Sequence, residues 1–224
     1  MINLEIPAKL QQVQQMAQQL AAGVFRPIAR KYDAIEHCDT PEELKPVAQM
    51  MAAMPRGSGN KGASDEIRNG SNMTGILAVE AMCWGDVGLM LSIPGSGLGN
   101  AAVMAVGTPE QKEKYGKLYC AMAITEPGAG SDSAAVSTTA ELDGDEWVLN
   151  GTKTWATNGG IANVHVVVAS VYPELGTRGQ ASFIIPPDTP GLSQGQKFLK
   201  HGIRASHTAE VVLDGVRVPG RCLL

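Results

Sequence analysis

The amino-acid composition changes near residue 120, and this change constrains the fold more than any other feature of the sequence. Nine of the ten methionines precede residue 121. Val, Ile and Thr together number 17 in residues 1–120 and 25 in residues 121–224. Met and Ala favour helices, whereas β-branched residues favour strands. We therefore predict an α+β chain, with an all-α N-terminal domain over residues 1–119 and an antiparallel, barrel- or sandwich-like β domain over residues 120–224.

Charge and hydrophobicity exclude two classes of protein. The 224 residues include 22 acidic and 18 basic side chains, which gives a net charge of −4 without any run of Lys or Arg. Aromatic residues make up only 4% of the chain. We therefore expect no nucleic-acid partner. A hydrophobic share of 44% is typical of a chain that buries a core rather than of a disordered one.

Targeting signals and cysteine spacing bear on the compartment. The four cysteines, Cys38, Cys83, Cys120 and Cys222, are far apart and form no metal-binding pair, which favours free thiols in a reducing compartment. The first twenty residues lack the basic start and apolar core of a secretory signal and the arginines of a transit peptide. No apolar run reaches the ~18 residues of a membrane span. We expect a cytoplasmic protein without a membrane span.

Hydrophobic periodicity predicts the helices of the first half. Apolar residues recur every three or four positions over residues 8–30, which indicates an amphipathic helix that Pro27 kinks or divides. Residues 73–91 are apolar nearly all round and predict a buried central helix. A short Ala-rich helix should follow at residues 99–106, and the Gly-rich residues 55–64 predict a surface loop.

Two segments carry the same signature of a helix start. Thr40-Pro41-Glu42-Glu43 and Thr108-Pro109-Glu110-Gln111 both place Thr before Pro, with Glu or Gln three residues after the Thr. This spacing is typical of a capping box, in which the two side chains satisfy each other's free backbone N–H groups. We predict a helix after each Thr, the second running toward Tyr119.

Alternation of apolar and polar residues predicts strands in the second half. Residues 136–142 alternate, Asp143-Gly144 supplies a turn, and Trp147 and Leu149 continue the alternation, which is typical of a hairpin. Further predicted strands cover residues 164–171, 182–186 and 210–219.

The segment Met122–Asp132, MAITEPGAGSD, is the first that suggests a binding site. Pro127-Gly128 predicts a turn, and the small residues after it let another group approach the backbone closely. The hydroxyl of Ser131 and nearby backbone N–H groups would suit a phosphate or pyrophosphate. The glycine spacing fits neither a dinucleotide-binding Rossmann turn nor a P-loop. Taken alone, the segment also fits an ordinary tight turn after a strand.

The second such segment is Asn150–Gly160, NGTKTWATNGG. Trp155 lies between two threonines and shortly before the turn-forming pair Asn158-Gly159. Taken alone, this pattern fits a core tryptophan beside a hairpin turn as well as it fits a ligand site.

Together, these two segments resemble the acyl-CoA dehydrogenase family. TEPGAGSD matches the flavin-loop signature of that family, and residues 153–159, KTWATNG, match its Lys-x-Trp-Ile-Thr-Asn-Gly element with Ala156 in place of Ile. Residues 200–219 resemble the end of the family's middle domain, and residues 107–115 the last helix of its N-terminal domain. Over residues 1–106 the resemblance is diffuse and depends on the helical pattern and on FRPIARKYD.

The resemblance implies a fold and an activity. The family has a helical N-terminal domain, a middle β domain and a C-terminal helical bundle, with FAD beside the β domain. Its members oxidise an acyl-CoA thioester to trans-2-enoyl-CoA, a step of fatty-acid β-oxidation. A carboxylate takes the α-proton and the β-hydrogen leaves as hydride to the flavin. The implied partners are an acyl-CoA substrate, an electron acceptor such as electron-transfer flavoprotein and, in the full-length form, further copies of the chain.

The resemblance also assigns roles to the residues of the flavin loop. Met122, Ile124 and Thr125 should line the flavin, with Thr125 donating a hydrogen bond to its pyrimidine side. Gly130 and Ser131 should contact the FAD phosphates. Ser131 should also bind the CoA portion of the substrate.

A second group of cofactor-binding roles falls on the tryptophan element. Trp155 should cover the isoalloxazine face opposite the substrate, and Ala156 should lie beside it. Thr157 should donate a hydrogen bond to the nitrogen that accepts the hydride.

This sequence departs from the family pattern in three places. The link from Tyr115 to Ala121 is short. His207 stands where Asp is common, which we interpret as a surface or interface change rather than a catalytic base. The sequence stops at Leu224, before the bundle in which the family carries its catalytic Glu. We therefore expect no catalytic base among these residues, Glu126 of the flavin loop included, and no metal ligand.

Two other functions remain open from the sequence. The chain could be a catalytically inactive fragment or partner subunit of a complete acyl-CoA dehydrogenase. It could also keep the fold and act as a flavin oxidase or monooxygenase that reacts with oxygen.

Overall fold

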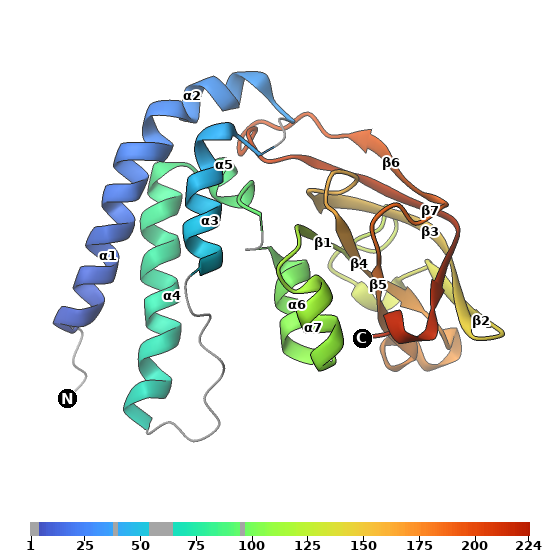
Figure 1. Cartoon of the computed structure of the whole chain (residues 1–224). Helices are drawn as coiled ribbons and strands as arrows, with labels where there is room; N and C mark the ends of the chain where they lie inside the picture. The colour runs from blue at the N-terminus through green and yellow to red at the C-terminus, as the bar shows by residue number, and fades with distance from the viewer. Residues whose placement is uncertain (1–4, 38–39, 54–64, 95–96) are drawn as a thin grey trace.

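The computed structural model of the chain describes residues 5–37, 40–53, 65–94 and 97–224 (Figure 1). The loop predicted at residues 55–64 lies outside these described residues. Helices occupy the described chain as far as Tyr115, and the first strand begins at Cys120. The predicted change from helix to strand near residue 120 is therefore confirmed. The helices are α1 (Ala8–Leu20), α2 (Arg26–Ile35), α3 (Lys45–Ala53), α4 (Asp65–Gly85), α5 (Val87–Leu91), α6 (Leu98–Val106) and α7 (Pro109–Tyr115).

The predicted long helix near the N-terminus is confirmed, and it is divided before Pro27. α1 passes through a π-helical turn at Ala21–Phe25 into α2. Pro27 has no N–H to donate and its ring crowds the carbonyl of Gly23, so the wider turn accommodates it without ending the helix. α1 and α4 then lie side by side, and α2 reaches from them toward the sheet (Figure 1).

One of the two predicted capping boxes forms and the other does not. The hydroxyl of Thr108 accepts from the N–H of Gln111 while the Gln111 amide accepts from the N–H of Thr108. A short helix does begin at Glu42, but the hydroxyl of Thr40 donates to the carbonyl of Ser92, 3.2 Å away, instead of capping it. The predicted cap at Thr40 is therefore wrong because a tertiary contact takes its side chain.

Glu43, the partner of Thr40 in the predicted capping box, also makes its contacts elsewhere. It accepts hydrogen bonds from Lys31 Nζ at 2.8 Å and from the Tyr32 hydroxyl at 2.5 Å. Both donors lie on α2, so Glu43 joins two helices rather than closing one. A contact between elements has replaced the local one that the spacing predicted.

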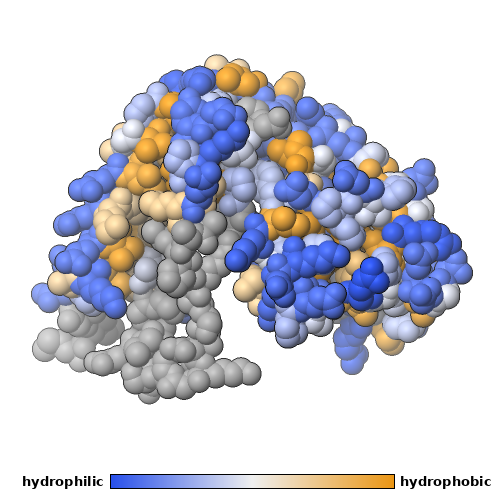
Figure 2. Space-filling model, viewed as in Figure 1, coloured by the Kyte–Doolittle hydropathy of each residue, from blue (hydrophilic) through white to orange (hydrophobic). Residues whose placement is uncertain are grey.

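The predicted central helix is interrupted and only partly buried. α4 ends at Gly85, and the Asp86 side chain then caps α5 by accepting from the N–H of Leu89 at 2.8 Å. Ile76 and Trp84 on α4 are 61% and 57% exposed, so burial on all sides is wrong. Figure 2 shows a hydrophobic band over the helical part of this face, whereas the part over the sheet is mainly hydrophilic. Apolar residues on every side of this helix therefore did not mean that every side is buried.

Seven strands form one mixed sheet in the described chain. They are β1 (Cys120–Ala123), β2 (Thr139–Asp143), β3 (Glu146–Thr157), β4 (Val164–Ser170), β5 (Gln180–Ile185), β6 (Leu192–Lys197) and β7 (Thr208–Pro219), in the order β1-β4-β2-β3-β7-β6 with β5 on β4. The predicted hairpin is β2–β3, and the other predicted strands are β4, β5 and β7.

The purely antiparallel arrangement that we predicted needs a correction. β1 and β4 pair in parallel, with Cys120 opposite Val164, and β2 meets β4 in parallel at Thr139 and Ser170. Between β1 and β4 the chain forms the β2–β3 hairpin, and β4 then lies beside β1 and runs in the same direction. β6 was not predicted, since LSQGQK is polar and lies at an edge of the sheet where alternation is weak.

Two apolar clusters form the interior of the described part of the chain. The sheet cluster includes Val103 of α6 and Tyr115 of α7, so these helices pack on the sheet. The helical cluster includes Ala205, which lies before β7 and touches the helical part of the chain. At that junction a Cβ on Gly88 would come within 3.1 Å of Ala205 Cβ, so glycine permits the close approach of α5.

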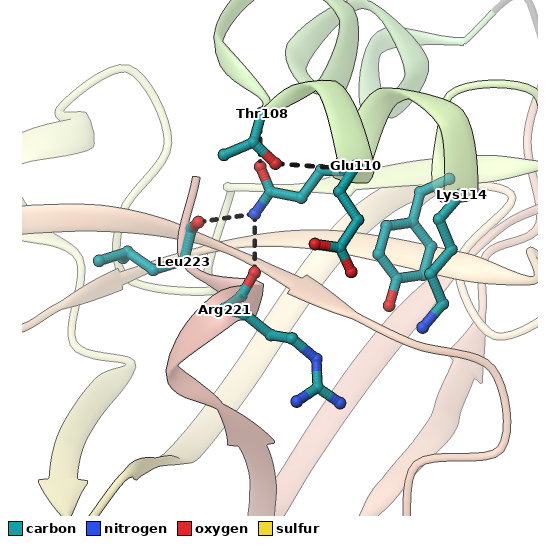
Figure 3. A pocket seen from close by; sticks show the side chains of 7 residues that line it. Thr108, Glu110, Lys114, Arg221 and Leu223 are labelled. Carbon is teal, nitrogen blue, oxygen red and sulfur yellow. Dashed lines mark hydrogen bonds between the residues drawn. The ribbon is translucent and has the colours of Figure 1, made fainter.

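Helix α7 also binds the last residues of the sequence through the side chain of Gln111. The Gln111 side-chain amide donates to the carbonyls of Arg221 and Leu223 at 2.8 and 2.9 Å. This contact lies beside a hollow of about 180 Å³. Figure 3 shows the hydrogen bonds to Arg221 and Leu223, with Thr108 beside them and the side chains of Lys114 and Arg221 extending away from them. The helix ends at Tyr115 rather than at the predicted Tyr119.

Candidate functional site

A cavity of about 360 Å³ lies where β1, the loop after it and β3 meet α5 and α6. Five of the eight residues to which we assigned cofactor contacts line it: Met122, Ile124, Thr125, Trp155 and Thr157. The remaining lining residues are Val79, Met90, Leu91, Gly97, Leu98, Cys120, Thr154 and Asn158. The wall is thus mostly apolar with a few polar groups, which is typical of a small-molecule site.

Strand β1 supplies one wall because its residues alternate. Ala121 and Ala123 are buried, while Met122 is partly exposed between them. Ile124 and Thr125 continue past the strand end and remain accessible. The two faces of one short strand therefore separate core from cavity.

The loop after β1 begins with the turn that Pro127-Gly128 predicted. The backbone groups of Glu126 and Ala129 exchange hydrogen bonds of 3.0 and 3.1 Å across it. A Cβ on Gly128 or on Gly130 would meet nothing within 4 Å, and neither residue has a positive φ. Packing within the chain therefore requires no glycine at either position.

Gly130, Ser131 and Ala156 do not line this cavity. Gly130 and Ser131 are exposed on the loop, farther along the chain than the turn. Ala156 is buried in the sheet core, opposite Ala209 of β7. The structure thus brings five of the eight assigned residues together and leaves two on the adjoining loop and one in the core.

A buried ion pair anchors the loop to β3, and sequence reasoning missed it. Lys153 Nζ donates to Glu126 Oε1 at 2.7 Å and to the Ile124 carbonyl at 3.1 Å. The Glu126 carboxylate also accepts from the backbone N–H groups and the hydroxyls of Ser137 and Thr138. The two charges therefore fix the path of the chain from the cavity wall to the loop.

The carboxylate of Glu126 is held in its ionised form. Burial alone would raise its pKa, but hydrogen bonds from Lys153, Ser137 and Thr138 lower that pKa to about 2. Burial lowers the pKa of the Lys153 ammonium, and Glu126 opposes this change. A carboxylate with all these donors is a poor proton acceptor.

Trp155 projects from a bulge in β3. The register with β7 shifts between Lys153 and Ala156, and Trp155 has a φ of +57°. Its side chain is 56% exposed and stacks on Phe198, with 4.0 Å between ring centroids and an interplanar angle of 20°. The N–H of Thr154 donates to the Thr125 carbonyl at 2.7 Å, which joins the bulge to the loop.

Asn158 also lines the cavity and was not among the residues we assigned. Its Nδ2 donates to the Leu91 carbonyl of α5 at 3.2 Å, and its backbone N–H donates to the His207 carbonyl at 2.9 Å. Its buried Oδ1 has no hydrogen-bond partner. The Asn-Gly turn in the sequence was the signal available, but it did not reveal the contact with α5.

The interpretation of His207 as a surface or interface change is wrong. Its side chain is 1% exposed. Nε2 lies 3.0 Å from both the Gly159 carbonyl and Gln194 Oε1, and the ring meets His37 edge-on at 5.4 Å between centroids. Burial lowers the pKa of its imidazole. His207 therefore packs behind the cavity wall, on the turn that follows Asn158.

Two further observations concern the described residues as a whole. Cys83, Cys120 and Cys222 are free thiols. Among the described helices, none combines the length and the apolarity that crossing a bilayer needs.

Comparison with known proteins agrees with this architecture. The chain is 35% identical to the mitochondrial short-chain specific acyl-CoA dehydrogenase of Bos taurus over 99% of its own length and 54% of that protein. Its fold matches butyryl-CoA dehydrogenase of Megasphaera elsdenii with a TM-score of 0.83 and 27% identity, over 100% of this chain and 60% of that one. It also matches a glutaryl-CoA dehydrogenase of Mycobacterium smegmatis in complex with FADH2, with a TM-score of 0.80 and 28% identity, over 97% of this chain and 55% of that one.

The chain thus spans about half the length of the curated relative that it matches. Residues 7–123 match the family model for the acyl-CoA dehydrogenase N-terminal domain. Residues 121–216 match the model for the acyl-CoA dehydrogenase middle domain. The chain belongs to the acyl-CoA dehydrogenase family.

Proposed function

We propose that this chain forms the FAD-binding part of an enzyme that oxidises an acyl-CoA thioester to its trans-2-enoyl-CoA. One observation carries the proposal: Met122, Thr125, Trp155 and Thr157 come from two separate segments and line a single cavity. Their chemistry suits a flavin, because a planar ring can stack on the indole while two hydroxyls offer hydrogen bonds at its edge.

The donor set and the open loop fit FAD. Thr157 would hold the nitrogen that accepts the hydride, and Thr125 the pyrimidine edge. The unpartnered Oδ1 of Asn158 leaves one acceptor free at the same wall. Gly130 and Ser131 would hold the phosphates, since the space around Gly130 is open to a ligand. When bound, FAD supplies the acceptor for the hydride from the β-carbon.

The proton from the α-carbon needs a base that these residues do not provide. No Asp or Glu is among the described residues that line the cavity, and Glu126 is committed to Lys153. We expect the base to be a carboxylate outside the described residues, as the resemblance to longer family members implies. The chain's own contribution is then to bind and orient the flavin and to shield one of its faces from water.

The partners and the compartment follow from the same proposal. An acyl-CoA would approach the face of the flavin opposite Trp155, with Ser131 near its CoA portion. A redox protein such as electron-transfer flavoprotein would receive the electrons. We propose a cytoplasmic location and, for the full-length form, a homo-oligomer.

Binding of FAD by the purified chain is the first test. FAD should bind to the wild type, and the Trp155→Ala variant should bind it roughly tenfold more weakly because it lacks the stacking ring. Trp84→Ala is the matched control, since Trp84 is similarly exposed but does not line the cavity. Unchanged affinity in Trp155→Ala and Thr157→Val would contradict the assignment.

Acyl-CoA oxidation is the second test and separates the alternatives. Acyl-CoAs of different chain lengths are added to the FAD-loaded chain with an artificial electron acceptor, with and without oxygen. Bleaching of the flavin and formation of enoyl-CoA support the dehydrogenase. A flavin that binds but is never bleached fits both a base outside the described residues and an inactive fragment or partner subunit. Peroxide formed without the acceptor favours an oxidase.

A further inference from the structure

We propose that Phe198 is the positioning residue for Trp155: its ring supports one face of the indole, so that the other face is presented to the flavin. This inference rests on the proposed function, and it adds a residue that belongs to neither of the two motifs. Phe198 follows β6 and lies 43 positions beyond Trp155 in the sequence.

The geometry of the pair supports a positioning role. The ring centroids are 4.0 Å apart and the planes are inclined by 20°, so the contact is face to face. Trp155 sits at a bulge with a positive φ and more than half of its side chain is exposed, which leaves few other neighbours to fix the indole. Without the phenyl ring, the indole could adopt other rotamers and would have to be ordered when the flavin binds.

Phe198 is itself held from two sides. Its backbone N–H donates to the Thr208 carbonyl of β7 at 3.0 Å. Two residues later, Lys200 Nζ donates to Thr208 Oγ1 at 2.7 Å and to the Ser206 carbonyl. The Lys200 N–H donates to Glu36 Oε1, just after α2, at 2.9 Å. The support for the indole is therefore fixed to both the sheet and the helical part of the chain.

The inference is tested first without FAD. Substituting Trp84→Phe and Trp147→Phe leaves Trp155 as the sole tryptophan. In this background, Phe198→Leu should lower the fluorescence anisotropy of Trp155 and increase its quenching by acrylamide. Phe198→Tyr keeps the ring and should leave both values unchanged. Leu199→Ala, at the exposed neighbouring position, is the control. An indole equally ordered in Phe198→Leu would overturn the inference.

The second measurement uses FAD itself. Phe198→Leu should weaken FAD binding roughly tenfold and change the absorption spectrum of the bound flavin, and Phe198→Tyr should restore both. Normal FAD binding in the wild type and in Phe198→Leu alike overturns the inference alone. A wild type that binds no FAD overturns the proposed function and this inference with it. Phe198→Met serves the same purpose if Phe198→Leu does not fold, as judged by its thermal midpoint.

Discussion

Lys153 and Glu126 form an ion pair inside the protein, with 2.7 Å between Nζ and Oε1 and side chains that are 0% and 2% exposed. The pair ties the loop after β1 to the centre of β3. Of the residues assigned to the flavin, Thr125 directly precedes Glu126 and Trp155 lies two positions after Lys153. The arrangement of the cavity wall therefore depends on a contact between two charges.

Removing one charge of this pair should destabilise the fold. Lys153→Met leaves the Glu126 carboxylate buried without its cation, and we expect the free energy of unfolding to fall by about 3–5 kcal/mol. Urea unfolding at pH 7 measures the change. The double variant Lys153→Met with Glu126→Gln should be more stable than the single variant, because neither buried charge remains. Lys45→Met, which removes an exposed partner of Glu42, should change stability by less than about 0.5 kcal/mol. Equal effects of Lys153→Met and Lys45→Met would contradict this account.

Acid should destabilise the protein through His165. Burial lowers the pKa of this imidazole from 6.5 to about 4, and its Nε2 accepts from the Gly160 N–H at 3.0 Å. Between these two pH values the unfolded chain binds a proton that the folded chain does not. The free energy of unfolding should therefore fall as the pH drops from 6.5 to 4, by on the order of 3 kcal/mol from this residue.

The variant His165→Gln can keep an acceptor for Gly160 but cannot be protonated. Urea unfolding at pH 7.5 and pH 4.5 should show a smaller loss of stability for His165→Gln than for the wild type. His201→Gln, at an exposed position, is the control and should retain the wild-type difference. Below about pH 4.5 Glu126 should lower the free energy of unfolding further, because its pKa in the folded chain lies near 2 and the unfolded chain therefore binds a proton first. The same pH dependence in both variants would sink the assignment to His165.

Helix α6 should be sensitive to a single methyl group. A Cβ on Gly99 would lie 2.6 Å from the Ala121 carbonyl of β1, so Gly99→Ala should push the helix from the strand at a cost of about 1–3 kcal/mol. Gly75→Ala is the matched control in α4, where a Cβ would meet nothing within 4 Å. That variant should gain up to about 1 kcal/mol from helix propensity. Thermal unfolding of both variants checks the opposite signs.

Gly130→Ala should separate ligand binding from stability. The chain has room for this methyl group and no positive φ to strain, so the free energy of unfolding should change by less than about 0.5 kcal/mol. If the FAD phosphates approach this backbone, the affinity for FAD should fall. Gly202→Ala also meets open space but lies away from the cavity, and it should affect neither quantity. An affinity for FAD that Gly130→Ala leaves unchanged would remove the phosphate role of this loop.

Local patterns predicted the elements better than the contacts between them. The same Thr-Pro-Glu spacing gave a capping box at Thr108 but not at Thr40, because only Thr40 meets the Ser92 carbonyl. Both site segments could be recognised because their chemistry lies in contiguous residues. The pairing of Lys153 with Glu126 could not, since it joins β3 to the loop after β1 across 27 positions of the sequence, and only the tertiary fold brings the two together. The burial of His207 depends in the same way on Gln194 and His37.

The parallel pairing of β1 with β4 has a consequence for how the site forms during folding. Forming it closes a long loop, because Cys120 and its partner Val164 are 44 positions apart in the sequence. The entropy lost in closing this loop is recovered only once the hairpin β2–β3 and strand β4 are in place. The cavity wall is thus a product of non-local contacts, and competence to bind a flavin should appear late in refolding, together with the sheet and not with the helices.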